Sequence, residues 1–300
     1  MFETLTIAPP DAIFGLNEAI RRDPRPEKIN LGAGVYKDEA GKTPVFAAVK
    51  EAERRLVASQ PSKNYLPMDG YPEFIRGVQR LLFGGEHEIL SEGRAATVQT
   101  PGGTGALRVA GDFLKQAAGA SRLWLSEPTW PNHPQIFGAV DLPIQTYAYF
   151  STETNGLDFP GLVRSLEAAR PGDVVLLHGT CHNPTGVDPD LEQWAQIAEL
   201  LAGRGALPLV DFAYQGLAHG LEADVEWLRV LAARVPEMVV CTSYSKNFGL
   251  YNERVGALTL VARNAENAEA ALSQIKRTVR ANYSNPPAHG AEVVATSSPT

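Results

Sequence analysis

From residue 95 onward, short apolar runs alternate with segments in which apolar residues recur at helical spacing. The runs are four to seven residues long and occupy positions 95–99, 123–126, 174–178, 207–210, 238–242 and 255–261. Helical patterns lie between several of them, at 105–118, 162–169 and 191–201. Strands that are apolar throughout and are separated by helices favour a mostly parallel sheet covered on both faces. The pattern therefore predicts an α/β fold, a three-layer sandwich.

The part of the chain before residue 95 has a weaker pattern. Residues 1–42 are rich in proline, glycine and charge, and we expect an arm with irregular structure there. A helix is expected next, capped by Thr43, with Pro44 in its first turn and Phe46, Val49 and Ala52 along one face.

Unusually polar residues follow five of the apolar runs. They are Pro-Gly-Gly-Thr-Gly at 101–105, Glu-Pro-Thr-Trp-Pro-Asn-His at 127–133, His178 with Cys-His-Asn-Pro-Thr-Gly at 181–186, Asp-Phe-Ala-Tyr at 211–214, and Ser-Tyr-Ser-Lys-Asn at 243–247. In open α/β sheets, ligands bind beyond the carboxyl ends of the strands. We therefore expect these five segments to form one site.

Lys246 and its neighbours favour a phosphorylated carbonyl ligand. A lysine that is partly withdrawn from water has a lowered pKa and can form a Schiff base, although a lysine extending from a sheet edge is the commoner case. The glycines at 101–105 suit a phosphate at a helix start, or simply a tight turn. Ser243 and Arg254 lie on either side of the lysine in sequence and could both bind a phosphate.

Four further residues suit an aromatic ring, and each also has an ordinary structural interpretation. Asp211 could pair with a ring nitrogen or cap a turn, and Tyr214 could donate to an oxyanion. The side chain of Asn183 could point to the same edge of the sheet, or the residue could only form a turn. Trp130 could stack on a planar ligand or pack in the core. Pyridoxal 5′-phosphate (PLP) would use the whole set.

Composition excludes several other classes of function. Lys and Arg total 27 against 34 Asp and Glu, a net charge of −7, so we expect neither nucleic acid nor a membrane as partner. The two cysteines, Cys181 and Cys241, are far apart, so we expect no thiolate metal site and no disulfide framework. The first ten residues lack the pattern of a signal peptide. We therefore expect a cytoplasmic protein.

Several long motifs resemble the class I PLP-dependent aminotransferases, and among these the bacterial aspartate aminotransferase subgroup. They occupy positions 99–108, 181–186, 211–216, 243–256 and 280–287. The resemblance implies the fold type I of PLP-dependent transferases. It also implies an N-terminal arm and part of a small domain at residues 1–43, and a large PLP-binding domain at residues 44–300.

The resemblance assigns the central chemistry to a few residues. Lys246 would hold PLP as a Schiff base and would move the proton between the substrate Cα and the cofactor. Asp211 would keep the pyridine nitrogen protonated, with support from His133 and His178.

Other residues would bind the rest of the cofactor and the substrate. Tyr214 and Asn183 would hydrogen-bond the phenolic oxygen, Trp130 would stack on the ring, and Gly34 would contact the substrate through its backbone. Trp130 and Asn183 would also contact the substrate. The phosphate would be bound by Gly103, Thr104, Ser243 and Arg254.

The family further implies a homodimer with shared active sites. Tyr65 would reach the neighbour's phosphate, and Arg280 the distal carboxylate of the neighbour's substrate. An arginine there suits a dicarboxylate, so we expect transamination between L-aspartate and 2-oxoglutarate. The residues Leu66-Pro67-Met68 lean toward the aromatic amino acid aminotransferases, which are the alternative.

Family members continue beyond residue 300, and the further part carries the arginine that binds the substrate α-carboxylate. The sequence therefore predicts a C-terminally shortened chain with an incomplete small domain. We expect PLP binding to survive and transamination to be weakened, so a PLP-binding fragment of little activity is a further alternative.

Overall fold

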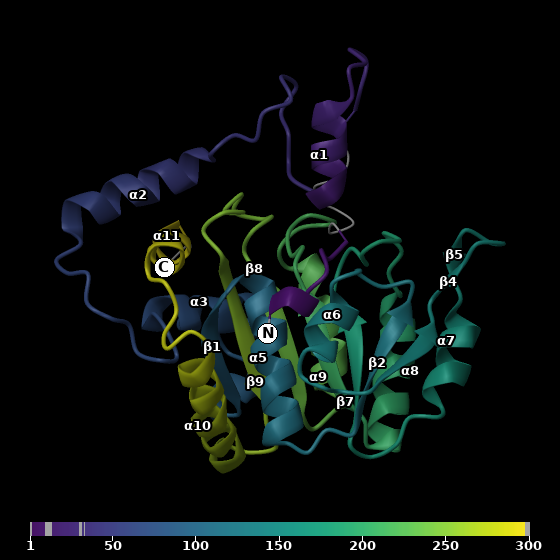
Figure 1. The fold of residues 1–300 in the computed structure, drawn as a ribbon. Coiled ribbons are helices and arrows are strands. Elements are labelled where there is room, and N and C mark those ends of the chain that lie inside the picture. The colour runs from purple at the N-terminus through teal and green to yellow at the C-terminus, as the bar shows by residue number, and fades with distance from the viewer. Residues whose placement is uncertain (1, 10–13, 30–31, 33, 298–300) are drawn as a thin grey trace. The chain divides into compact units, whose positions relative to one another are not determined.

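The computed structural model describes residues 2–9, 14–29, 32 and 34–297 (Figure 1). The chain divides into two compact units, Met1–Pro44 and Val45–Thr300. The first unit contains the short helix η1 (Phe2–Thr4) and the helix α1 (Phe14–Arg22). The expectation of an irregular arm is therefore wrong at α1, where Leu16 and Ile20 are spaced for one helix face and Arg21 and Arg22 suit the C-terminal dipole. The assignment of the two units to a small and a large domain stays a prediction.

The second unit is built on a seven-stranded sheet in the order β1-β9-β8-β7-β6-β2-β3. Strand β9 is antiparallel to both of its neighbours, and the remaining pairs are parallel. The predicted α/β fold with a mostly parallel sheet is confirmed. The strands are β1 (Ala95–Pro101), β2 (Arg122–Glu127), β3 (Ile144–Ala148), β6 (Asp173–His178), β7 (Leu207–Phe212), β8 (Met238–Ser243) and β9 (Val255–Val261). A separate ribbon pairs β4 (Phe150–Ser151) with β5 (Gly156–Leu157).

Helices cover both faces of this sheet (Figure 1). Adjacent residues of a strand point to opposite faces, so Val210 packs in one core cluster and Leu209 in the other. One cluster includes residues of α5 (Gly102–Gln116), α6 (His133–Gly138) and α10 (Ala265–Asn282). The other includes residues of α2 (Ala47–Ser59), α3 (Pro72–Phe83), α4 (Glu88–Ser91), α7 (Phe159–Leu166), α8 (Leu191–Arg204), η2 (Ala223–Val225), α9 (Glu226–Ala232) and α11 (His289–Ser297). Among the residues described, no helix combines the length and apolar character needed to cross a membrane.

Two helix starts differ from the sequence expectation. Helix α2 begins at Ala47, not near Thr43, because Phe46 has extended backbone (ψ 145°) and packs against the core. Helix α5 begins at Gly102, so the glycines expected in the preceding loop form its first turn instead. This second difference brings the helix N-terminus directly to the edge of the sheet.

Candidate active site

Asp211 lies at the end of the central strand β7, in register with both neighbouring strands. Its Cα partners are His178 at the end of β6 and Cys241 in β8. The Asp211 side chain is 13% exposed, and its Oδ2 accepts a hydrogen bond of 2.9 Å from Nε2 of the fully buried His133. Within the described residues its Oδ1 accepts no hydrogen bond, so one carboxylate oxygen is available to a ligand.

A chain of hydrogen bonds extends from Asp211 toward the end of β6. His133 Nδ1 lies 2.8 Å from Thr129 Oγ1, and the same hydroxyl lies 3.2 Å from His178 Nε2. All donors are matched if His178 donates to Thr129, Thr129 to His133 and His133 to Asp211. Burial lowers the pKa of His178 well below its ordinary value, as do its neighbours His182 and His133. A neutral His178 therefore holds His133 in the orientation that serves Asp211.

Lys246 lies three residues beyond β8, with its Nζ 5.1 Å from the centre of the Tyr214 ring. Burial lowers the pKa of this amine; the charge of Asp211 raises it and that of Arg254 lowers it further, with a net lowering. A lowered pKa gives more of the neutral, nucleophilic amine at neutral pH. Burial, followed by the charge of Asp211, raises the pKa of Tyr214, so its phenol stays protonated and can donate.

The ends of β1 and β8 and the start of β9 approach so closely that side chains are excluded from the turn. Gly102 has a φ of 76°, and a Cβ there would overlap the guanidinium of Arg254. A Cβ at Gly256 would overlap the backbone of Gly102, and one at Gly103 would lie 3.0 Å from the Cβ of Ser243. The first N–H groups of α5 thus lie beside a guanidinium and a hydroxyl, an arrangement suited to phosphate.

Arg254 reaches this turn through an unusual backbone conformation. Its φ of 55° is left-handed, which is uncommon for a residue other than glycine. Nη1 donates to the main-chain oxygen of Tyr251 (2.9 Å) and to Oγ of Ser245 (3.2 Å). In the described part of the chain Nη2 has no acceptor, and it faces the start of α5, whose first turn also contains Thr104.

Two further predicted residues lie on loops beside this group. Asn183 donates its backbone N–H to His178 Nδ1 (3.4 Å), and its side chain is near enough to the phenol of Tyr214 to offset part of the rise in the pKa of that phenol. Trp130 is partly buried and meets His133 edge to face, with ring centres 5.2 Å apart. The contacts thus connect Trp130, Asn183 and the histidines to the surroundings of Asp211.

Tyr65 and Arg280 line a cavity of about 950 Å³, together with Leu66, Met68 and Asn285. Arg280 is exposed at the end of α10 and donates to Oγ of Ser284. None of the residues grouped around Lys246 lines this cavity.

Gly34 is an exposed residue of the first unit, and its predicted contact with the substrate stays a prediction. Its neighbours in the motif, Leu31 and Ala33, lie outside the described residues, as do residues 298–300.

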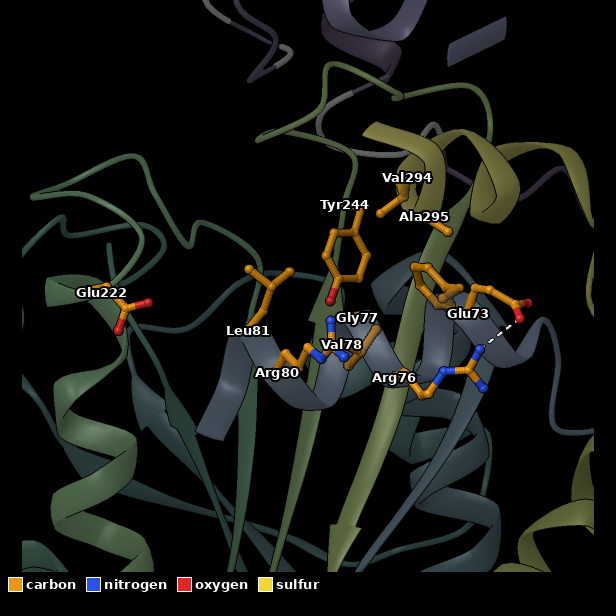
Figure 2. Close-up of a pocket in the computed structure, with 11 residues that line it drawn as sticks. Glu73, Arg76, Gly77, Val78, Arg80, Leu81, Glu222, Tyr244, Val294 and Ala295 are labelled. Carbon is orange, nitrogen blue, oxygen red and sulfur yellow. Dashed lines mark hydrogen bonds and ion pairs between the residues drawn. The ribbon is translucent and has the colours of Figure 1, made fainter. Parts of the chain in front are cut away.

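A smaller pocket of about 420 Å³ lies between α3, Tyr244 and α11 (Figure 2). Phe74, Val78 and Leu81 from α3 and Val294 from α11 make most of its surface apolar. None of the predicted site residues lines it, so the polar group at the sheet edge is the stronger candidate for chemistry.

Comparison with known proteins identifies the family. Residues 26–298 match the aminotransferase class I and II family. The chain belongs to this family. Aspartate aminotransferases of Salmonella typhi and Escherichia coli (strain K12) are each 58% identical to it over 296 residues, which are 99% of this chain and 75% of each relative. The solved structure of an aromatic-amino-acid aminotransferase from Burkholderia pseudomallei, covalently bound to pyridoxal phosphate, has a TM-score of 0.95 at 43% identity and covers 98% of this chain and 74% of that one.

The predicted family resemblance is therefore confirmed, and the chain is an aminotransferase of the PLP-dependent kind. The residues present fit this cofactor. The glycine turn leaves room for a phosphate beside Arg254, and Asp211 presents a carboxylate oxygen to which no described residue donates. The half-buried amine of Lys246 lies close to both charges.

Sequence reasoning missed the residues that connect these groups. Thr129 joins the two predicted histidines, and Ser126 lies 3.0 Å from Nε2 of His182, which stacks on Tyr149. Thr129 and Ser126 occur at the same strand end as the predicted Trp130, which is the signal that could have found them.

Proposed function

We propose that the chain transfers an amino group between L-aspartate and 2-oxoglutarate, giving oxaloacetate and L-glutamate. The observation that carries this proposal is the Lys246 amine, half-buried 5.1 Å from the centre of the Tyr214 ring and close to the charges of Asp211 and Arg254. The 58% identity to two aspartate aminotransferases supports the choice of substrate.

In this proposal Lys246 attaches the cofactor covalently, and its released amine moves the proton at the substrate Cα. PLP, when bound, supplies an electron sink that stabilises the negative charge left at that carbon. Asp211 holds a proton at the ring nitrogen through its available oxygen, and the hydrogen bond from His133 keeps the carboxylate in place. Tyr214 and Asn183 donate to the phenolic oxygen.

The remaining predicted residues bind the cofactor's phosphate and faces. The phosphate is bound by the N–H groups of Gly103 and Thr104, the hydroxyl of Ser243 and the guanidinium of Arg254. Both the helix N-terminus and the cation stabilise its negative charge. Trp130 stacks on the ring.

We further propose a homodimer, in which Arg280 binds the distal carboxylate of the neighbour's substrate and Tyr65 contacts the neighbour's phosphate. Both side chains line one open cavity, which supports a shared role. The cytoplasmic location stays a prediction.

Aromatic amino acids are the second candidate substrates. The cavity that contains Arg280 is also lined by Leu66, Met68, Pro286 and Pro287, which offer apolar surface for a ring. The aromatic-amino-acid aminotransferase from Burkholderia pseudomallei has the same fold.

The attachment of PLP is tested by borohydride reduction of the chain with PLP, followed by peptide mapping. We expect the label on Lys246, and no label at that peptide in Lys246→Ala. A label on another lysine would overturn the mechanism.

The substrate is tested in the donor half-reaction alone, by following the absorbance change of the PLP-loaded chain on addition of aspartate or phenylalanine without any oxo acid, in the wild-type chain and in Arg280→Leu. Because a bidentate pair with the distal carboxylate is lost, we expect this variant to lose at least about tenfold in rate with aspartate and little with phenylalanine. Equal losses with both donors would contradict the assigned role of Arg280.

A further inference from the structure

Asp224 lies between the loops that carry Asn183 and Tyr214. It belongs to η2, immediately before α9, and only 2% of its surface is exposed. Within the described part of the chain no cation pairs with its carboxylate, which accepts hydrogen bonds from main-chain N–H groups instead. A buried carboxylate without a counter-ion requires such donors. The positions of these donors show which backbone segment the carboxylate holds in place.

The carboxylate organises the loop that follows β7. Its Oδ2 accepts from the N–H groups of Gly216 (2.8 Å) and Ala218 (3.1 Å), and its Oδ1 accepts from that of His219 (2.8 Å). Tyr214 lies two residues before the first of these donors, and its carbonyl closes the same turn by accepting from the N–H of Leu217 (3.0 Å). The backbone that carries the Tyr214 phenol is therefore wound around this one side chain.

The main-chain carbonyl of Asp224 holds the second loop. It accepts a hydrogen bond of 2.7 Å from Oγ1 of Thr180, in the loop that follows β6, and another of 2.7 Å from Nε1 of Trp227. Thr180 is 7% exposed and lies three residues before Asn183. One residue thus connects the two loops that carry the donors to the phenolic oxygen of the cofactor.

Asp188 shows how this differs from an ordinary loop carboxylate. It accepts from the N–H groups of Cys181 (2.7 Å) and His182 (2.8 Å), which belong to the same loop as Asp188 itself. Asp188 therefore shapes one loop, whereas Asp224 holds its own loop through its carboxylate and the loop after β6 through its main-chain carbonyl.

We propose that Asp224 is a positioning residue that sets the separation of Tyr214 and Asn183, and with it the strength of the hydrogen bonds that both give to the cofactor. The cofactor part of this proposal rests on the proposed function. The connection between the loops is a property of the protein alone and can be measured without PLP.

The first test is hydrogen–deuterium exchange on the PLP-free chain, comparing the wild type with Asp224→Asn. We expect at least fivefold faster exchange at 212–221, which loses its acceptors on the carboxylate. We expect the same at 179–187, because the backbone of residue 224, whose carbonyl accepts from Thr180, is no longer fixed by its own side chain. The matched control is Asp158→Asn, because the Asp158 carboxylate also accepts from a backbone N–H (Gly161, 2.9 Å) but caps α7. We expect the control to leave both segments unchanged. Faster exchange at 212–221 alone in Asp224→Asn would overturn the bridge.

Thr180→Val provides a second variant of nearly the same shape. It removes the hydrogen bond to the Asp224 carbonyl and the one that the hydroxyl accepts from Trp227 Nε1 (3.2 Å), whose N–H keeps the Asp224 carbonyl as acceptor. We expect faster exchange at 179–187 and less than a twofold change at 212–221. Unchanged exchange at 179–187 would show that the carbonyl does not hold this loop and would overturn the proposal.

The second test uses the chain loaded with PLP and follows the pH midpoint of the cofactor's absorbance change. Donors to the phenolic oxygen stabilise its anionic form and so lower this midpoint. We expect both Asp224→Asn and Thr180→Val to raise the midpoint by at least half a pH unit, and Asp158→Asn to leave it unchanged. An unchanged midpoint despite faster exchange would refute the positioning role. A wild-type chain in which PLP does not label Lys246 overturns the proposed function instead, and the exchange result then stands by itself.

Discussion

Replacement of His133 by alanine perturbs the candidate site at the residue that holds Asp211. The His133 ring is fully buried, donates to Asp211 Oδ2 at 2.9 Å and lies 2.8 Å from the Thr129 hydroxyl. It also meets Trp130 and His178 edge to face, with ring centres 5.2 Å apart in both cases. The substitution therefore removes two hydrogen bonds and a packed ring at the same time.

Two terms set the size of the effect. Leaving the shielded carboxylate of Asp211 without its donor costs about 1–3 kcal/mol. The cavity left by the ring adds roughly 2 kcal/mol, below the 3–5 kcal/mol that is typical of a larger Phe→Ala change. The sum is about 4 kcal/mol. With an unfolding entropy of about 2.1 cal/mol/K per residue, a unit of this size loses about 2 °C in Tm for each kcal/mol, so we expect a decrease of about 8 °C.

Circular dichroism melting of the PLP-free chain measures this decrease without any contribution from the cofactor. His133→Gln is the control, because its amide nitrogen can replace Nε2 as the donor to Asp211, and we expect about half the loss. Addition of PLP then raises the Tm of the wild type and of His133→Gln more than that of His133→Ala, since the stabilisation by a bound ligand at a given concentration increases with its affinity. A His133→Ala protein that melts within 2 °C of the wild type would refute the argument that this histidine supports Asp211.

Further predictions concern charge and packing at the same edge. The pKa of the Lys246 amine is lowered in the folded chain, so below pH 10.5 the unfolded state binds more protons than the folded state. We therefore expect PLP-free Lys246→Met to be more stable than the wild type at pH 7. The difference should disappear as the pH approaches 10.5, which a series of Tm measurements against pH would show. Burial and the neighbouring His133 lower the pKa of His182 to about 4. The free energy of unfolding should therefore fall as the pH decreases from 6.5 to about 4, by up to roughly 1.4 kcal/mol per pH unit. His182→Gln should flatten this slope in acid denaturation. Gly256→Ala should weaken PLP binding at least about tenfold in a fluorescence titration, because its Cβ would overlap the adjoining turn, whereas Gly203→Ala in open space on α8 should raise stability by about 1 kcal/mol.

The position of the site could be predicted because two simple patterns agree. Runs such as residues 207–210 are apolar throughout, which requires burial on both faces and hence a parallel arrangement. Once the strands are parallel, the residues that follow them meet at one edge whatever the exact strand order. Asp211, His178 and Ser243 could therefore be grouped from the sequence, and registers such as His178↔Asp211 and Ser243↔Gly256 agree with this grouping.

Other features could not be predicted, because they depend on contacts between residues distant in sequence. Helix α2 begins at Ala47 because Phe46 packs against the core with an extended backbone. Local capping rules do not predict such a contact. Asp224 follows β7 by twelve residues and resembles any surface acid in the sequence. Only the folded loop shows that its carboxylate receives three N–H groups.

The shielded aspartates of the second unit illustrate why residue type alone does not identify a ligand-binding group. Asp173 accepts from both Nε and Nη2 of Arg122, from Trp124 Nε1 and from the N–H of Arg170, so both of its carboxylate oxygens have donors within the protein. Asp224 is likewise satisfied through both of its carboxylate oxygens. Asp211 differs, because His133 serves only Oδ2 and the described residues offer no donor to Oδ1. That oxygen is not among the buried side-chain atoms without a partner, so a donor from water or from a ligand can reach it. Within the described part of the chain Asp112 is also shielded and accepts through Oδ2 alone, but it lies within helix α5 and pairs with Arg108. The accessible oxygen together with the position at the sheet edge, beside Lys246, therefore suits Asp211 to a protonated ring nitrogen.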